Sequence, residues 1–331
     1  MIKLPSQLRL VSDRKLLSNI EARMEIVEQK LIDATRHTDS MVESMASHLA
    51  RAGGKRLRPV LLLLTAELGD PNQPDVLDAA VVMEITHLAT LYHDDVMDQA
   101  SKRRGVDSAH IVWGNNVAIL TGDLLFARAS NIVSGLGEEA LKLQAKVFEQ
   151  LVLGQLHETI GPAEGQDPLE HYLEVLRDKT GSLIALSARL GALLSGADKS
   201  LQEPLQLFGE RIGVAFQLVD DLIDIESTKE QSGKVAGTDL LAGVPTLPVL
   251  LLSKYEDQAS KDLHAKITGG LEESELASVL AELRAHPVMA QARAETVRWG
   301  DSAIEAVSQL PAGSVRDALI AFANAVVDRK G

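Results

Sequence analysis

Helical periodicity runs through almost all of this 331-residue chain, and no stretch alternates apolar and polar residues as a strand would. Apolar residues make up 45% of the sequence and aromatic residues only 3%, with leucine and alanine dominant. That combination favours helices packed on helices. The length permits one large domain or two. Because no low-complexity linker or block of like charge divides the sequence, we predict a single all-α domain over residues 1–331.

Glycine and proline residues punctuate the pattern and set the expected helix ends. The predicted helices cover residues 13–50, 56–68, 75–99, 115–134, 138–160, 168–195, 203–227, 246–256, 273–285, 288–309 and 313–329. The polar, glycine-dotted segment 226–245 is predicted to be a mobile loop that could act as a lid.

Charge and cysteine content exclude several classes of protein. The net charge of −14 argues against a nucleic-acid partner, which needs a broad basic surface. The absence of cysteine excludes disulfides, thiolate zinc sites and a cysteine nucleophile. The longest apolar run, around Val60–Leu64, is far short of the ~20 residues that span a bilayer. With no signal-peptide pattern at the N-terminus, we expect a soluble, cytoplasmic protein without an integral membrane segment.

Two copies of one acidic pattern carry most of the functional information: DDVMD at Asp94–Asp98 and DDLID at Asp220–Asp224. The first and last carboxylates of each are four residues apart, so on a helix they project from one face. Like charges at that spacing, late in a helix, are mildly destabilising unless cations offset them. Oxygen ligands without nitrogen or sulfur partners indicate Mg²⁺ shared with a phosphate substrate.

On a helical wheel His87 shares the face of Asp94 and Asp98, and Gln217 shares the face of the second motif. Two such faces opposite each other would make a carboxylate-walled cavity for several divalent ions. The alternative is a pair of solvated acidic helix ends.

Basic residues cluster in GGKRLRP at Gly53–Pro59 and in SKRRG at Ser101–Gly105, which begins three residues after Asp98. Arginine forks match phosphate oxygens, and lysine offers a compact charge. These clusters predict a diphosphate site with a second anion nearby, unless they simply form salt bridges with acidic residues. Lys179–Thr180 and Gly233–Lys234 are weaker signals of the same kind.

Together these motifs resemble the trans-isoprenyl diphosphate synthases. The resemblance also includes GDLLFARA at Gly122–Ala129, KTGSL at Lys179–Leu183, FQLVDDLID and GKxxGTD, in the family's order, over most of residues 50–248. It implies a bundle of mostly antiparallel helices around a deep central cavity, the isoprenoid synthase type I fold, usually as a homodimer. The implied reaction condenses isopentenyl diphosphate with an allylic prenyl diphosphate, with three Mg²⁺ ions.

The resemblance also assigns roles by position. Asp94 and Asp98 would hold two Mg²⁺ ions and Asp220, with Asp224 through water, a third, supported by Asp95 and Asp221. The allylic diphosphate would be bound by Arg103, Lys179 and Lys234. Isopentenyl diphosphate would be bound by Lys55, Arg58, His87 and Arg104. Thr180 and Gln217 would direct dipoles at the developing allylic cation.

In the resembled family, large side chains just upstream of the first motif shorten the product. Here the fifth and fourth upstream residues are Ala89 and Thr90, both small, which favours a long-chain product such as a quinone side-chain precursor. Ala89 lies about 140° from Asp94 on the wheel, so its role rests on the resemblance alone. Ala89 could instead serve helix packing, and Ile85 or a neighbouring helix could end the pocket and give a geranylgeranyl product.

Two departures from the family pattern concern substrate binding. Asp107 stands where proline is common, and Val244 stands where a basic residue is common. Four competing hypotheses are a class I terpene cyclase, a head-to-head synthase, a non-catalytic partner subunit of a heteromeric synthase and an acidic helical scaffold that binds cations without chemistry. The second acidic motif, DDLID, argues against the cyclase. The isopentenyl-site residues argue against the head-to-head synthase, and the retention of both acidic motifs argues against the partner subunit. The scaffold would need no ordered set of basic residues.

Overall fold

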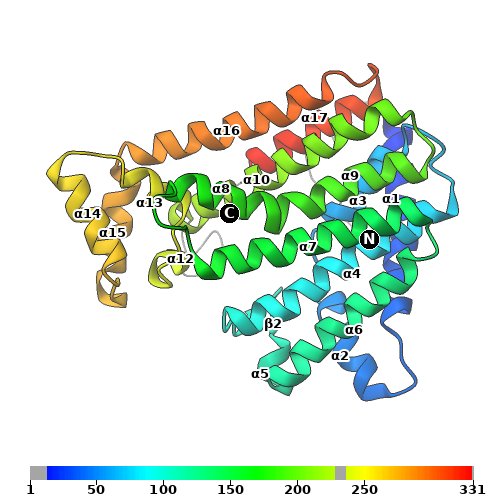
Figure 1. Cartoon of the computed structure of the whole chain (residues 1–331), viewed down its shortest axis with the longest axis horizontal. Coiled ribbons are helices and arrows are strands. Elements are labelled where there is room, and N and C mark those ends of the chain that lie inside the picture. Colours follow the sequence, from blue (N-terminus) through cyan, green and yellow to red (C-terminus); the bar gives the residue numbers. More distant parts are fainter. Residues whose placement is uncertain (1–12, 228–235, 330–331) are drawn as a thin grey trace. The chain divides into compact units, whose positions relative to one another are not determined.

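The computed structural model describes residues 13–227 and 236–329, and most of them are helical (Figure 1). The expected all-α fold is therefore confirmed. Contacts divide the chain into two compact units. Unit 1 is made of Met1–Glu149, Leu183–Gln206 and Gln309–Ala321, and unit 2 of Gln150–Ser182, Leu207–Ser308 and Phe322–Gly331. The single domain over residues 1–331 stays a prediction.

Unit 1 is organised around α4, which packs against α1, α3 and α6. Its elements are α1 (Arg14–Thr35), α2 (Ser40–Arg51), α3 (Leu57–Ala66), α4 (Pro74–Met97), β1 (Lys102–Arg103), β2 (Val106–Asp107), α5 (Ala109–Trp113), α6 (Asn115–Val133), the start of α7 (Glu138–Ile160), most of α9 (Ser182–Leu194), the 3₁₀ turn η3 (Lys199–Leu201) and the start of α17 (Ser314–Val327).

The sequence explains both ends of α4. Pro74 occupies the first turn, where its missing N–H costs nothing, and Asp75 complements the positive end of the helix dipole. The middle of α4 is buried on almost every side, in keeping with its mostly apolar sequence. Asp98 caps its C-terminus, and Gln99 follows with a left-handed φ of 51° that turns the chain away. The acidic motif therefore stands at the end of a rigid central helix.

The predicted helix 13–50 is wrong in one respect, because the chain breaks between α1 and α2. The Asp39 carboxylate accepts hydrogen bonds from the backbone N–H groups of Met41 at 2.8 Å and Val42 at 3.3 Å, which starts α2 anew. No glycine or proline marks this break. The β1–β2 hairpin and α5 were also not predicted; in Figure 1 they lie together near the C-terminal end of α4.

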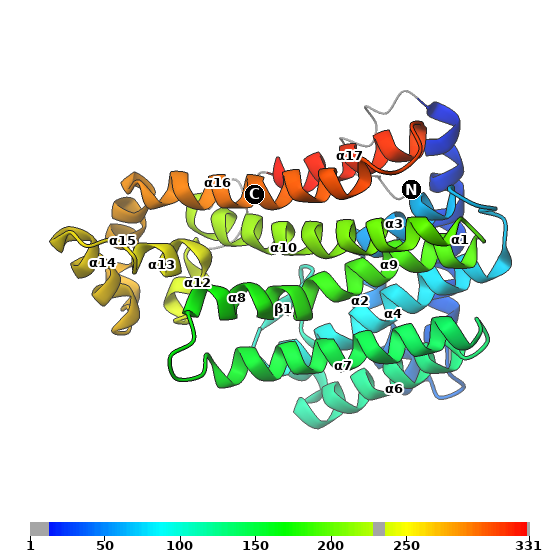
Figure 2. The same cartoon turned by 45° about the horizontal axis from the view of Figure 1, so that its top comes forward.

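Unit 2 has its own aliphatic core, formed by α10, α13, α14, α15 and α16. Figure 2 shows α10 and α16 running alongside each other, and Nη1 of Arg211 on α10 donates to the Ser302 carbonyl on α16 at 2.5 Å. Its elements are the end of α7, α8 (Pro168–Leu176), the π-helical turn η2 (Arg177–Gly181), α10 (Gln202–Glu226) from Leu207 onward, α12 (Thr238–Leu241), α13 (Leu247–Leu252), α14 (Gln258–Thr268), α15 (Glu273–Ala285), α16 (Val288–Val307) and the end of α17.

Three segments of unit 2 differ from the predictions. The helix expected at 246–256 is only the short α13, and α14 was missed because its exposed, polar surface gives a weak periodic signal. Part of the expected loop 226–245 is helical, as α12, and residues 228–235 lie outside the described residues. In the described part of the chain, no helix combines the length and apolar character that crossing a membrane requires.

Candidate active site

The three carboxylates of the first acidic motif differ in their exposure to solvent. Asp94 is half-buried and Asp98 is exposed, whereas Asp95 is buried. Nε and Nη2 of Arg103 both lie 2.6 Å from Oδ1 of Asp95. The other oxygen of Asp95 is buried and has no hydrogen-bond partner among the described residues. Asp95 therefore holds Arg103, while Asp94 and Asp98 stand one turn apart on the accessible side.

Arg103 and Arg104 are presented by the β1–β2 hairpin. Its register pairs Arg103 with Val106 and Lys102 with Asp107. The two turn residues, Arg104 (φ 53°) and Gly105 (φ 82°), are both left-handed, as tight two-residue hairpins require. Asp107 stands where the resembled family commonly has proline. Its carbonyl hydrogen-bonds His48 Nε2 at 2.8 Å, and the hairpin forms without proline.

Arg104 lies against the glycine turn of GGKRLRP. A Cβ added to Gly54 would meet the Arg104 guanidinium carbon at 2.7 Å, so only glycine allows this approach. Nη1 of Arg104 donates to the carbonyl oxygens of Leu49, at 3.2 Å, and Gly53. The structure thus brings together two basic clusters that are 50 residues apart in the sequence, as the prediction of one anion site requires.

Beneath this turn lies an ionic cluster that sequence reasoning missed. Arg56 places Nη1 2.7 Å from Oε1 of the fully buried Glu84 and Nε 2.5 Å from Glu28. These carboxylates keep the pKa of Arg56 raised although burial of its guanidinium opposes this. One signal was available: Glu84 is the single charged residue in the apolar stretch Val81–Ile85.

Arg58 and His87 share the electrostatic environment of the same region. Burial lowers the pKa of Arg58 to about 10, with Glu84 opposing this and Arg104 adding to it. Arg58 Nε has no hydrogen-bond partner in the described part of the chain. Burial, followed by Arg58 and Arg104, lowers the pKa of His87 well below its ordinary value. His87 is therefore a neutral imidazole beside a group of arginine cations.

The three predicted chain-length residues differ in exposure. Ala89 and Ile85 are completely buried in unit 1, and Thr90 is half-buried with its hydroxyl donating to the His87 carbonyl at 2.8 Å. Thr90 is thus the most accessible of the three.

In unit 2, Asp220 is half-buried and forms an ion pair with Arg329, near the C-terminus. The Arg329 guanidinium also stacks on Phe216, with its carbon 4.4 Å from the ring centre. Burial lowers the pKa of Arg329 to about 10, so the side chain keeps its charge at neutral pH. Sequence analysis did not single out Arg329, because the C-terminal segment carries no motif.

Asp221 turns inward, as Asp95 does in unit 1. It accepts hydrogen bonds from the Tyr172 hydroxyl and from the Leu247 backbone N–H at 2.8 Å. Burial raises the pKa of Asp221 to about 7, against the effect of these two donors. Both acidic motifs therefore have an inner carboxylate that is buried and bound by protein groups.

Asp224, near the end of α10, places its carboxylate at the start of α12. Its carboxylate accepts from the Thr238 hydroxyl at 2.8 Å and from the backbone N–H groups of Thr238 and Asp239, each at 3.2 Å. Gln217, also on α10, is half-buried. Val244, at the other departure position, is 42% exposed.

The KT pair at Lys179–Thr180 occupies the π-helical turn η2, a form often found at functional sites. Nζ of Lys179 lies 2.6 Å from Glu158, and Thr180 is buried. A Cβ on Gly181 would lie 3.0 Å from the Glu210 carbonyl, so glycine lets α10 approach the turn. Lys234, the other predicted diphosphate ligand of this kind, lies outside the described residues.

The carboxylates fit a hard divalent cation that shares its coordination with a substrate. The predicted metal ligands Asp94, Asp98, Asp220 and Asp224 offer only oxygen atoms. Among residues 13–227 and 236–329, no three histidine or carboxylate side chains converge into a closed metal cage. Mg²⁺ suits such an open set, because it keeps several waters and completes its octahedron with phosphate oxygens.

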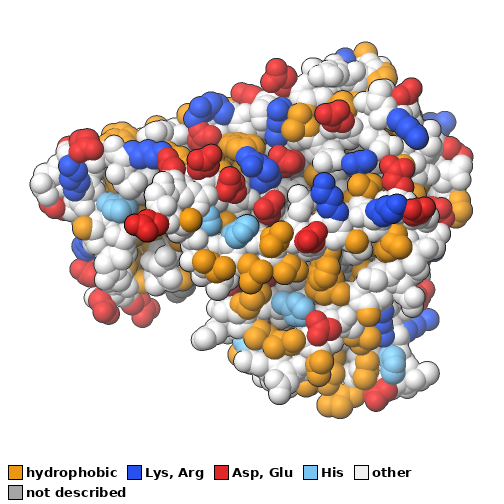
Figure 3. Space-filling model, viewed as in Figure 1, with side chains coloured by type: hydrophobic (Ala, Val, Ile, Leu, Met, Phe, Trp, Pro, Cys, Tyr) orange, Lys and Arg blue, Asp and Glu red, His pale blue; other side chains and the backbone are white. Residues whose placement is uncertain are grey.

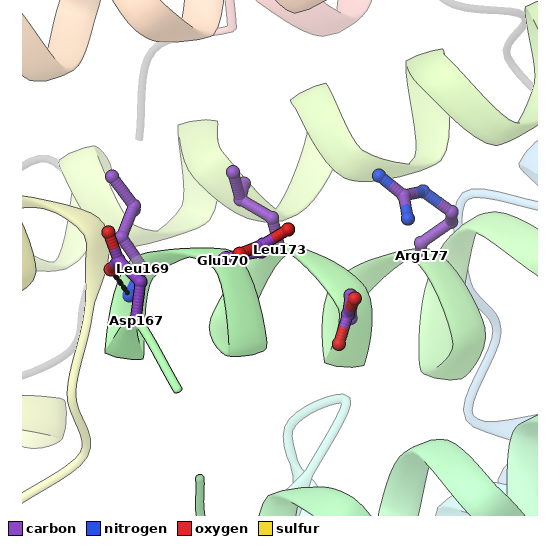
Figure 4. Close-up of a pocket in the computed structure, with 6 residues that line it drawn as sticks. Asp167, Leu169, Glu170, Leu173 and Arg177 are labelled. Carbon is purple, nitrogen blue, oxygen red and sulfur yellow. Dashed lines mark hydrogen bonds between the residues drawn. The ribbon is translucent and has the colours of Figure 1, made fainter. Parts of the chain in front are cut away.

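One pocket of unit 2 is lined by other residues. It has a volume of about 230 Å³ and runs along α8 (Figure 4). It is lined by Asp167, Leu169, Glu170, Leu173, Glu174 and Arg177. None of these belongs to the predicted site.

Comparison with known proteins gives consistent matches. The family profile described as polyprenyl synthetase matches residues 39–283. A nonaprenyl diphosphate synthase of Mycobacterium tuberculosis is 42% identical over 323 residues, covering 97% of this chain and 96% of the relative.

Two solved structures cover nearly the whole chain. A polyprenyl synthase from Caulobacter crescentus CB15, complexed with calcium and isoprenyl diphosphate, has a TM-score of 0.88 at 30% identity, over 96% of this chain and 97% of its own. A geranylgeranyl pyrophosphate synthase from Corynebacterium glutamicum, also with calcium and isoprenyl diphosphate, has a TM-score of 0.87 at 42% identity, over 97% and 99%.

Proposed function

The chain belongs to the polyprenyl synthetase family, and we propose that it condenses isopentenyl diphosphate head-to-tail with an allylic diphosphate to make a long-chain all-trans polyprenyl diphosphate. The observation that carries this proposal is in unit 1. Asp94 and Asp98 end α4, and the adjoining hairpin places Arg104 on the glycine turn of the other basic cluster. Accessible carboxylates beside a concentration of cationic side chains suit a metal-bound diphosphate next to a second, metal-free one.

Mg²⁺ would be held by Asp94, Asp98 and Asp220, with Asp224 acting through water, and we expect three ions with substrates bound. When bound, these ions would neutralise the negative charge that grows on the departing pyrophosphate. Asp95 and Asp221 act as supports, because each is buried and already bound to protein donors.

The cationic residues divide between the two substrates. Arg103, Lys179 and Lys234 bind the allylic diphosphate, and Lys55, Arg58, His87 and Arg104 bind isopentenyl diphosphate. The Arg104 guanidinium has five N–H donors. Three of them donate to the carbonyl oxygens of Leu49 and Gly53 and to the carboxylate of Glu84. Two donors, Nε and one hydrogen of Nη2, thus remain for a diphosphate. His87 contributes as a neutral hydrogen-bonding group.

The reaction breaks the bond between the allylic C1 and its diphosphate oxygen. The electron pair leaves with pyrophosphate, and dipoles of Thr180 and Gln217 stabilise the allylic cation. The double bond of isopentenyl diphosphate attacks that cation and forms the new carbon–carbon bond. The resulting tertiary cation loses a proton to the released pyrophosphate. Apolar surroundings keep water from trapping either cation.

Two observations support a long product: the small residues Ala89 and Thr90, and the 42% identity with a nonaprenyl diphosphate synthase. A geranylgeranyl product is the second candidate, because a structure with that activity in its name is equally similar at 42% identity. Ile85 or a residue of a neighbouring helix would then end the pocket.

We also propose that the protein is a homodimer. Large apolar side chains of unit 1 are exposed on α5 and α6: Ile111 at 54%, Val112 at 48%, Ile119 at 41% and Leu120 at 66%. Figure 3 shows hydrophobic side chains over this part of the surface. A second copy would cover such a face. Leu120→Asp should convert dimers to monomers in light scattering, and an unchanged mass would place the interface elsewhere. Cytoplasmic location also stays a prediction.

The proposed activity is tested by following pyrophosphate release together with incorporation of labelled isopentenyl diphosphate into acid-labile product. Both signals should require Mg²⁺, isopentenyl diphosphate and an allylic primer such as farnesyl diphosphate. No incorporation by the chain alone would favour the partner-subunit hypothesis. Incorporation restored by a second polypeptide would establish it.

A further inference from the structure

A single carboxylate oxygen joins three elements of unit 1 beneath the basic turn, defined here as Gly53–Arg56. Oε1 of Glu84, on α4, lies 2.7 Å from Nη1 of Arg56 and 3.4 Å from Nη2 of Arg104. Glu84 is 1% exposed and Arg56 is 4% exposed. Hydrogen bonds between buried charged groups are strong, and removing one partner leaves the other unsatisfied.

The same two arginines also hold the backbone of the basic turn. The Gly53 carbonyl accepts from Nη1 of Arg56 at 3.1 Å and from Nη1 of Arg104. The Ala50 carbonyl accepts from Nη2 of Arg56 at 2.9 Å. Arg56 itself has a left-handed φ of 51°, a conformation that these contacts must maintain. The turn that presents Lys55 is therefore fixed by side chains that converge on Glu84.

We propose that Glu84 is a positioning residue for isopentenyl diphosphate, an inference that rests on the proposed function. Its carboxylate orients the Arg104 guanidinium directly and the basic turn through Arg56. The two remaining donors of Arg104 are then held in a fixed orientation, and the charge of Arg104 acts on Arg58. Glu84 itself lies below these groups and does not touch the substrate.

If Glu84 were only a counter-charge for the arginines, its removal would change the affinity for isopentenyl diphosphate in the opposite direction. Removing a negative charge from a group of cations makes the local potential more positive, and this alone would strengthen binding of an anion. Loss of positioning weakens binding in spite of the more positive potential. The direction of the change therefore separates the two explanations.

The test compares Glu84→Met with Glu84→Gln. Both variants are neutral and close to glutamate in size, but only glutamine keeps an acceptor oxygen for Arg56 and Arg104. The full-length variants are titrated with isopentenyl diphosphate in a calorimeter, without allylic substrate. We expect Glu84→Met to lose about tenfold or more in affinity and Glu84→Gln clearly less, since only methionine leaves the donors of Arg56 and Arg104 without their acceptor. KM for the allylic substrate and kcat at saturation should stay unchanged.

Glu28→Gln is the matched control. Glu28 also pairs with Arg56, but from α1 and without an observed contact to Arg104. It should lower stability without changing isopentenyl diphosphate affinity. Equal or tighter binding by Glu84→Met overturns the proposal. If Glu84→Met does not fold, weaker binding by Glu84→Gln than by Glu28→Gln supports the proposal, and equal binding by the two overturns it. Wild-type protein that neither binds nor incorporates isopentenyl diphosphate would instead refute the proposed function.

Discussion

Nη2 of Arg103 lies 2.6 Å from Oδ1 of Asp95, and this ion pair ties the cationic hairpin to the helical turn that carries the first acidic motif. The second aspartate of DDVMD is thereby committed to a protein partner. Asp94 and Asp98 lie on the accessible side of the same turn. Within five residues the chain thus separates a structural carboxylate from two candidate metal ligands.

Asp94→Ala should lower turnover by about a hundredfold or more, the scale for losing one group that stabilises transition-state charge. Steady-state kinetics with saturating Mg²⁺ measures this. Asp123→Ala is the control, because Asp123 is also an aspartate of unit 1 but is exposed on α6 beside His93. Near-normal turnover of Asp94→Ala would remove Asp94 from the metal site.

Arg104→Ala should raise KM for isopentenyl diphosphate far more than KM for the allylic substrate. Arg104 has a φ of 53°, and alanine, like arginine, carries a Cβ, so the substitution leaves the backbone strain nearly unchanged. Its effect then reports the lost guanidinium. Initial rates with each substrate varied in turn provide the test, and equal effects on both KM values would contradict the assignment.

Ala89→Phe should shorten the product if Ala89 borders the elongation pocket. Because Ala89 is fully buried, the added ring should also cost about 1–3 kcal/mol of stability. Thr90→Phe is the comparison, since Thr90 is only half-buried. Product sizing and thermal unfolding of both variants give the answer. An unchanged chain length in both would move the end of the pocket to another helix.

Arg329→Ala should tighten divalent-metal binding, because the Arg329 guanidinium pairs with Asp220 and competes with a cation there. Because Asp220 remains open to solvent, this ion pair contributes up to about 1 kcal/mol, so we expect a gain of at most about fivefold. Calorimetric titration with Mn²⁺ measures it. Arg293→Ala is matched, as Arg293 pairs with Glu226 on the same helix outside the motif. Equal metal affinity in both variants would show that Arg329 does not compete.

His87→Gln should keep most of the affinity for isopentenyl diphosphate, since His87 is already neutral in the fold. Burial, then Arg58, lowers its pKa well below 6.5. As pH falls through 6.5 the unfolded chain gains a proton that folded His87 does not, so stability falls with pH. The wild type should therefore lose more stability than His87→Gln between pH 7.5 and pH 5.5. Urea unfolding of the wild type and the variant at both pH values measures this. If the two proteins lost equal stability as the pH fell, folded His87 would be protonated, contrary to the prediction.

The long helices could be predicted because their apolar periodicity is strong and glycine or proline marks their ends. The predicted helix 138–160 has the bounds of α7, and 115–134 differs from α6 by one residue. The break before α2 could not be predicted in this way, because an aspartate cap replaces glycine or proline as the signal. The two-residue strands of the hairpin are too short to show any alternation.

The site was predictable where its chemistry lies in local motifs and not where it depends on tertiary contacts. The wheel places Asp94 and Asp98 on one face, and in the fold they are the more accessible carboxylates of the motif. No sequence pattern links Glu84 to Arg56, 28 residues away, or Arg329 to Asp220, over 100 residues away. Such pairs form only when helices distant in the sequence pack together.

The most direct test of the proposed function sizes the product. Purified protein is incubated with Mg²⁺, labelled isopentenyl diphosphate and, separately, geranyl, farnesyl and geranylgeranyl diphosphates, and the dephosphorylated products are separated by length. The proposal predicts elongation of all three primers to one product well beyond twenty carbons. A product that ends at twenty carbons, with geranylgeranyl diphosphate left unextended, would contradict the long-chain assignment.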